Sequence, residues 1–126
     1  PLFVPLVENG RFRPGDTVIE TVAREYLEPL RQTGIDTLIL GCTHYPLLMD
    51  VIGSVMGPAV TLINASEEAA WDLKRALQDA GLLSPGPGGE ATLYASDQPS
   101  DFRTVAQQLL REELQKPVLP VDIDRY

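Results

Sequence analysis

The stretch Asp36-Thr-Leu-Ile-Leu-Gly-Cys-Thr-His-Tyr-Pro-Leu-Leu48 decides the fold of this chain. Its apolar run from Thr37 to Leu40 includes β-branched side chains and predicts a short, buried parallel strand. Gly41 permits a tight turn after the strand. Pro46 suits the first turn of a helix that stops at the Gly-Pro pair of residues 57–58. The stretch therefore combines a strand, a loop and a helix, from which parallel α/β sheets are built.

The loop within this stretch carries Cys42 and His44, the only cysteine and the only histidine of the chain. Both follow the carboxyl end of the predicted strand, which is where open α/β sheets bind their ligands. In an extended loop, residues i and i+2 point the same way, so the two side chains are expected on one side. A helix that starts behind the loop favours a thiolate over a thiol. We interpret this loop as the candidate functional site.

The segments around this stretch predict further alternation of strands and helices. Residues 2–7 are apolar, and Pro5 places them at a strand end or a sheet edge. Asp16 is a suitable N-cap for an amphipathic helix that ends near Gly34. The order β-α-β-α-β-α predicts an α/β fold, a parallel sheet flanked by helices. Its later members are a strand over residues 59–63 and a helix that Asn64 caps and Gly81 ends.

The rest of the chain carries weaker signals. Residues 84–89, with the sequence Ser-Pro-Gly-Pro-Gly-Gly, predict an exposed and mobile loop. A short strand over residues 91–95 and a helix capped by Ser100 or Asp101 follow, and the tail 116–126 predicts an edge strand or a terminal extension. The apolar face of the helix capped by Asn64 consists of Ala69, Ala70, Leu73, Ala76 and Leu77, with Trp71 beside them. The apolar face of the helix capped by Ser100 or Asp101 consists of Phe102, Val105, Leu109 and Leu110.

Composition and charge exclude several classes of partner. The chain has 126 residues, of which 18 are acidic and 10 basic, giving a net charge of −8. Without a basic stripe, neither nucleic acid nor an anionic membrane is expected to bind, and no apolar run approaches the roughly 20 residues of a membrane span. One cysteine cannot form an internal disulfide, so a cytoplasmic location is expected. Because the chain starts inside a predicted strand, we expect a fragment of a longer protein.

The residue types near the loop are suited to proton transfer. A cysteine reacts as its thiolate, and a histidine exchanges protons near neutral pH. If residues 2–7 form a parallel neighbour of the strand before Cys42, Glu8 shares its sheet edge and could orient His44 or transfer a proton. Zinc normally needs at least three protein ligands, and the loop supplies two, so no metal site is expected. The plainer alternatives are a buried structural cysteine, a loop-bonding histidine and a solvated glutamate.

The block from Leu38 to Leu48 resembles the second signature motif of the glutamate racemases. The opening Val4-Pro-Leu-Val-Glu8 resembles a segment upstream of that motif, with about the right gap between the two. The resemblance runs through the chain and is weak after residue 65. Asn64-Ala-Ser stands where an Asp-Ser-Ala type of sequence is more usual. Related aspartate racemases commonly carry an acidic residue in the place of His44.

This resemblance implies a function and a role for each candidate residue. Glutamate racemases interconvert L- and D-glutamate without a cofactor and supply D-glutamate for peptidoglycan. One cysteine removes the substrate's α-proton as a thiolate, and a second cysteine protonates the opposite face. By this resemblance, Cys42 is the cysteine that acts on the L-enantiomer, and His44 assists it. Glu8 matches the active-site glutamate of the family, and Thr43 matches a residue that holds the substrate.

The family pattern also contains parts that this chain lacks, namely an Asp-Ser-Gly start and a second cysteine in an Ala-Cys-Asn-Thr block. The resemblance implies two pseudo-symmetric lobes with the active site between them. Residues 1–64 would then belong to the lobe with the second catalytic cysteine, and residues 65–126 would return to the other lobe. The chain alone is therefore expected not to racemise glutamate, and its exposed apolar surface should make it self-associate. The family is often dimeric, so the resemblance, and not the sequence itself, suggests a homodimer for the whole protein.

Two other functions stay open on the sequence. A cysteine hydrolase or transferase that uses Cys42 and His44 would form a covalent thioester on the cysteine. A non-catalytic α/β module that binds a small acid or a partner would have a complete hydrophobic core without added chain. Alkylation separates the first of these from a racemase, because only a racemase site should be protected by D-glutamate.

Overall fold

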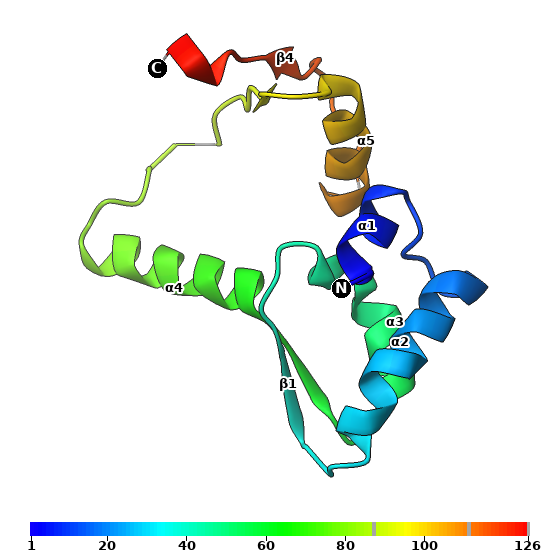
Figure 1. Ribbon diagram of the computed structural model, residues 1–126. Coiled ribbons are helices and arrows are strands. Elements are labelled where there is room, and N and C mark those ends of the chain that lie inside the picture. The colour runs from blue at the N-terminus through cyan, green and yellow to red at the C-terminus, as the bar shows by residue number, and fades with distance from the viewer. Residues whose placement is uncertain (87, 111, 126) are drawn as a thin grey trace. The chain divides into compact units, whose positions relative to one another are not determined.

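The computed structural model describes residues 1–86, 88–110 and 112–125, apart from the side chain of Leu109 (Figure 1). The chain divides into two compact units, Pro1–Leu83 and Ser84–Tyr126. The first unit contains the Cys-His loop and most of the buried side chains. The expected division near residue 64 concerns the lobes of a longer protein and stays a prediction.

The first unit has one parallel β-α-β arrangement at its centre. Strands β1 and β2 pair in parallel, with Thr37 opposite Thr61 and Leu40 opposite Asn64. The predicted strands, the helix between them and the helix after the second strand are confirmed. In chain order the elements are α1 (Phe3–Glu8), α2 (Thr17–Arg31), β1 (Thr37–Leu40), the 3₁₀ turn η1 (Tyr45–Leu48), α3 (Met49–Met56), β2 (Thr61–Asn64) and α4 (Ala65–Asp79).

The strand predicted for residues 2–7 is wrong, because this segment forms the helix α1. Its buried residues Phe3 and Val7 are four positions apart, which places them on one helical face. Pro5 lies in the first turn, where the backbone N–H groups have no partner within the helix, so a proline costs no hydrogen bond. A six-residue apolar run with proline in the middle fits both the two-residue period of a strand and the 3.6-residue period of a helix. Packing decided between the two structures.

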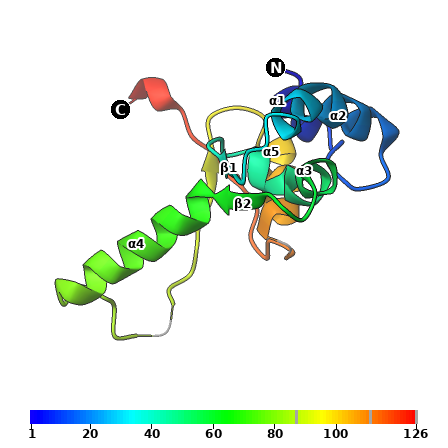
Figure 2. The ribbon, with the colours of Figure 1, turned by 90° about the horizontal axis from the view of Figure 1, so that it is seen from below.

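Helices α2 and α3 pack against each other beside β1 and form the core (Figures 1 and 2). The predicted cap is confirmed, since the Asp16 carboxylate accepts a hydrogen bond from the backbone N–H of Val18 at 2.9 Å. The buried residues of the two helices recur at helical spacing, as an amphipathic face requires. They are Ile19, Ala23 and Leu27 on α2, and Val51, Ile52 and Met56 on α3.

The other side of the sheet and the helix α4 are uncovered in this unit. Leu40 is buried, whereas Ile39, on the opposite face of the same strand, is 66% exposed. The predicted cap Asn64 accepts hydrogen bonds from the backbone N–H groups of Ser66 and Glu67. However, α4 has no buried residue, and it points away from α1, α2 and α3 in both views (Figures 1 and 2). The helix was therefore predicted correctly, but no residue of its apolar face is buried within this unit.

The second unit contains β3 (Tyr94–Ala95), α5 (Pro99–Leu110), β4 (Leu119–Pro120) and η2 (Ile123–Arg125). Strands β3 and β4 pair in parallel, so the predicted edge strand in the tail is confirmed, and the strand predicted over 91–95 is shorter than expected. The loop 84–89 is exposed where it is described, but residue 87 and the chain end at residue 126 lie outside the described residues, as does the side chain of Leu109. Within the described ranges, no helix has the length and apolarity to cross a membrane.

Candidate active site

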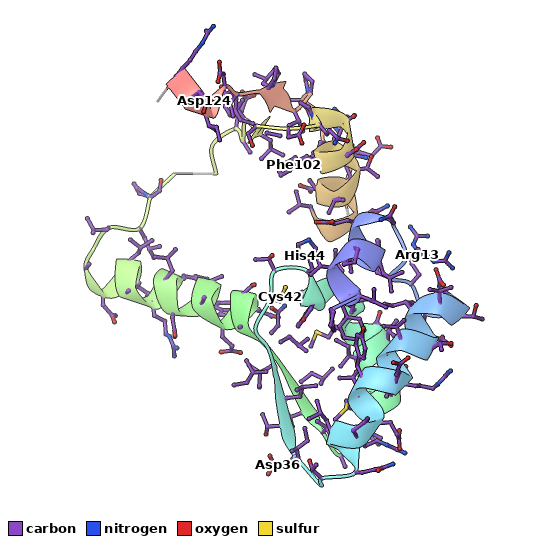
Figure 3. All side chains as sticks on the ribbon, viewed as in Figure 1. Arg13, Asp36, Cys42, His44, Phe102 and Asp124 are labelled. Carbon is purple, nitrogen blue, oxygen red and sulfur yellow. The ribbon has the colours of Figure 1, made fainter. Side chains whose placement is uncertain are left out.

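The candidate site is the loop between β1 and η1, which holds Cys42, Thr43 and His44 (Figure 3). Both ends of the loop are anchored, because Leu40 is 2% exposed and Leu48 is fully buried. The loop closes as a turn, in which the backbone N–H of Tyr45 donates to the Cys42 carbonyl at 3.1 Å. The predicted position of the loop at the carboxyl end of a parallel strand is confirmed.

Of the four side chains that the sequence singled out, the imidazole of His44 lies next to the other three. Its Nδ1 atom lies 3.9 Å from Cys42 Sγ and 3.4 Å from Thr43 Oγ1, both within hydrogen-bonding range. Its Nε2 atom lies 3.3 Å from Glu8 Oε1, an ion-pair distance. The expected grouping of Cys42, His44 and Glu8 is therefore present in the structure, and each ring nitrogen faces a different partner.

Glu8 reaches this place by a route that the sequence did not predict. It is the last residue of α1 and not the end of a strand beside β1. The ring of Phe3 holds α1 in position, because it packs edge-on against Tyr26 at 5.4 Å and against Tyr45 at 5.7 Å between ring centroids. Tyr45 belongs to η1, directly after the loop, so this contact ties Glu8 to His44. The spacing of Phe3 and Val7 was the signal that could have revealed this helix.

The end of α1 is also fixed by its backbone. The N–H of Gly10 donates to the Val7 carbonyl at 2.9 Å, and the N–H of Arg11 donates to the Leu6 carbonyl at 2.8 Å. With Gly10 at a φ of +75°, this is the Schellman arrangement that commonly ends helices. The Asn-Gly turn predicted at residues 9–10 is therefore present, and it holds Glu8 on a rigid element.

The side chains of the site are partly accessible to solvent. Cys42 and His44 are half-buried, with the His44 side chain 28% exposed, and Glu8 and Thr43 are exposed. A thiol next to an imidazole can give its proton to the ring and then act as a nucleophile or a base. In the described ranges, no group of three or more His, Cys, Asp and Glu side chains is placed to hold a metal ion.

Comparisons with known proteins identify relatives for the whole chain, although no protein-family model matches it. The glutamate racemase of Thermoanaerobacter sp. (strain X514) is 38% identical over 126 residues, which are 100% of this chain and 47% of the relative. Two crystal structures superpose closely. The structure of a glutamate racemase isoform from Bacillus anthracis has a TM-score of 0.84 and 35% identity, covering 98% of this chain and 45% of that one.

The second crystal structure is that of glutamate racemase from Francisella tularensis in complex with D-glutamate. Its TM-score is 0.83 with 35% identity, and the match covers 99% of this chain and 46% of that one. The chain thus spans slightly less than half the length of the relatives that it matches. The α/β fold predicted from the sequence is confirmed by these structures. The chain is a homologue of the glutamate racemases, to which it corresponds over slightly less than half of their length.

Proposed function

We propose that this chain carries one part of the active site of an enzyme that interconverts L- and D-glutamate without a cofactor. The observation that carries the proposal is the contact of one imidazole with both Cys42 and Glu8, in a chain similar over its full length to glutamate racemases. The D-glutamate complex of the Francisella tularensis relative supports glutamate as the substrate.

The proposed chemistry is a proton transfer at the substrate's α-carbon. The Cys42 thiolate takes the α-proton of L-glutamate, so that an S–H bond forms while the C–H bond breaks and leaves a carbanion. A thiol outside this chain gives its proton to the opposite face, which produces D-glutamate and a second thiolate. His44 accepts the Cys42 proton beforehand through Nδ1, and Thr43 holds the substrate by its exposed hydroxyl. Both cysteines then exchange protons with solvent to complete the cycle.

The proposal extends to the setting in which the whole enzyme works. D-Glutamate is a building block of peptidoglycan, so the enzyme would serve cell-wall synthesis. The single cysteine of this chain favours a reducing cytoplasm. A homodimer is the proposed assembly, and residues 65–126 are proposed to return to a second lobe that supplies the other thiol.

The test compares this chain alone with a chimera. The chimera joins this chain to the part of the Thermus thermophilus glutamate racemase that this chain does not cover. We choose this relative because its structure matches 100% of this chain at 38% identity. Both proteins are incubated with L-glutamate, and D-glutamate is measured by chiral chromatography. We expect D-glutamate from the chimera and none from the chain alone, because two bases are needed on opposite faces.

Controls separate this function from its competitors. D-Glutamate formation by the chain alone would contradict the two-base proposal. A thioester on Cys42, detected by mass spectrometry after incubation with glutamate esters or amides, would support a hydrolase instead. We expect D-glutamate to protect Cys42 of the chimera from an alkylating reagent. A folded chimera that shows neither this protection nor turnover would contradict glutamate as the substrate.

A further inference from the structure

We propose that the Asn9–Gly10 pair at the end of α1 is a site of spontaneous deamidation, and that the closed end of this helix slows the reaction. Of the two asparagines in the chain, only Asn9 is followed by glycine. This modification site goes beyond the proposed function, because neither the reaction nor its rate depends on a substrate or on a second thiol.

Deamidation is a reaction of an asparagine with its own backbone and with water. The backbone nitrogen of the next residue attacks the side-chain carbonyl carbon, so that a C–N bond forms. The side-chain nitrogen leaves as ammonia and takes the backbone N–H proton with it. Water then opens the resulting succinimide ring and yields aspartate or isoaspartate. A glycine after the asparagine favours the attack, because it has no Cβ to obstruct the approach and has the greatest backbone freedom.

In the folded chain, hydrogen bonds hold both reacting groups of this pair. The backbone nitrogen of Gly10, which is the nucleophile, donates its proton to the Val7 carbonyl at 2.9 Å. The side-chain nitrogen of Asn9, which is the leaving group, donates to the Pro5 carbonyl at 2.7 Å. Because the two groups are bonded to different carbonyls of α1, we expect the attack only after the helix end has opened.

The end of α1 is placed to open by itself. Asn9 and Gly10 are exposed, so solvent reaches both residues. The helix has six residues, of which Phe3 and Val7 are buried. A short element with few buried contacts and with exposed backbone hydrogen bonds opens at a lower free energy than the whole protein. Local opening of α1, and not global unfolding, should therefore set the rate of deamidation in the folded chain.

The products of the reaction disturb the helix end that carries Glu8. An aspartate carboxylate has no proton to donate, so the hydrogen bond to the Pro5 carbonyl is lost. The new carboxylate also adds a negative charge at the C-terminal end of α1, which the helix dipole disfavours. In isoaspartate, the main chain gains one carbon before Gly10, which displaces its N–H from the Val7 carbonyl. Both products should therefore loosen the support of Glu8.

The experiment follows deamidation of the intact chain at pH 8, in buffer and in guanidinium chloride at a concentration that unfolds it. Peptide mapping by mass spectrometry measures the reaction at Asn9 and at Asn64, which is an internal control because alanine follows it. In the unfolded chain, we expect Asn9 to react faster than Asn64. In buffer, the reaction of Asn9 should be at least about ten-fold slower than in guanidinium chloride, because it requires a rarely populated open state.

Two variants distinguish local opening from global unfolding. Phe3→Ala removes the ring that packs against Tyr26 and Tyr45 and thereby loosens α1. Ile52→Ala destabilises the core at α3 instead. In buffer, we expect Phe3→Ala to speed up the reaction of Asn9 about ten-fold, and Ile52→Ala to change it less than about two-fold. Circular dichroism shows whether each variant is folded, and the comparison of buffer with guanidinium chloride tests the proposal even where Phe3→Ala fails to fold.

Three results would overturn the proposal. The first is a rate at Asn9 that is equal in buffer and in guanidinium chloride. The second is a rate at Asn9 in the unfolded chain that does not exceed the rate at Asn64. The third is an acceleration by folded Phe3→Ala that is no greater than the acceleration by Ile52→Ala. A chimera that fails to racemise glutamate would contradict the proposed function and would leave all three comparisons unchanged.

Discussion

Helices α3 and α4 follow the two paired strands of the same unit, yet their environments are opposite. The eight-residue α3 has Val51, Ile52 and Met56 almost completely buried. The 15-residue α4 has none, and its Trp71 and Leu73 are 53% and 61% exposed. Both helices are amphipathic, so amphipathicity reports which face can pack and does not report whether anything covers it.

Because α3 is buried and α4 is exposed, the two helices are stabilised by different interactions. Because most helix stability in proteins comes from packing of the apolar face, α3 should unfold only with the whole core. Helix α4 relies on its cap, on the Arg75–Asp72 ion pair and on the contact of Lys74 with the Trp71 ring at 4.9 Å. The three experiments that follow sharpen this comparison, from the largest expected effect to the smallest.

Ile52→Ala tests the buried helix. Ile52 is 1% exposed and belongs to the core cluster, to which α2 and β1 also contribute. Removing three carbons from this buried site should lower the free energy of unfolding by about 2–5 kcal/mol, measured by urea denaturation. A loss below about 1 kcal/mol would show that α3 is not held by the core, since changes of that size are ordinary for exposed sites.

The cap of α2, the helix on which α3 packs, should show a smaller, pH-dependent effect. The Arg11 guanidinium donates to Asp16 Oδ1 at 2.8 Å and thereby lowers the pKa of Asp16, with a further contribution from the Val18 N–H. A lowered pKa means that this stabilisation is present above the ordinary pKa of aspartate and is lost as the pH falls through the lowered value.

The variant Asp16→Asn measures this effect, because asparagine still caps the helix but carries no charge. Between pH 5 and pH 3, the melting temperature of the unmodified chain should fall further than that of the variant, because only the former loses the attraction between Arg11 and the Asp16 carboxylate. Equal decreases in the two proteins would contradict the role of the Arg11–Asp16 pair.

Leu73→Ala should have the smallest effect. Since Leu73 is 61% exposed on a helix without buried residues, its truncation should change the free energy of unfolding by less than about 0.5 kcal/mol. Urea denaturation under the conditions used for Ile52→Ala provides the direct comparison. A loss of 2 kcal/mol or more, comparable to a buried leucine, would mean that α4 packs against another part of the chain or another copy in solution.

Local signals predicted the elements around the site well. The run before Gly41, the caps at Asp16 and Asn64, and the helix end at Gly57 all gave the structure that was expected. Each of these signals depends on a few neighbouring residues, such as a side-chain oxygen near free backbone N–H groups. The Cys-His loop was found for the same reason.

The features that were not predicted depend on residues far apart in the chain. The apolar run at residues 2–7 formed a helix because Phe3 packs against Tyr26 and Tyr45, which lie beyond any local window. Glu8 lies beside His44 as expected, but it reaches His44 from a helix end and not from a sheet edge. The exposure of α4 likewise depends on what packs against it, which its own spacing does not record.

The central claim is that Cys42 is a base for the α-proton of L-glutamate, and proton exchange in D₂O tests it most directly. The chimera described above and its Cys42→Ser variant are incubated with L-glutamate, and loss of the α-proton signal is followed by NMR. We expect exchange in the chimera and at least a hundred-fold slower exchange in the variant, because a serine hydroxyl is far less acidic than a thiol and general-base contributions are about 10²–10⁴-fold. Equal rates in the two proteins would contradict the claim.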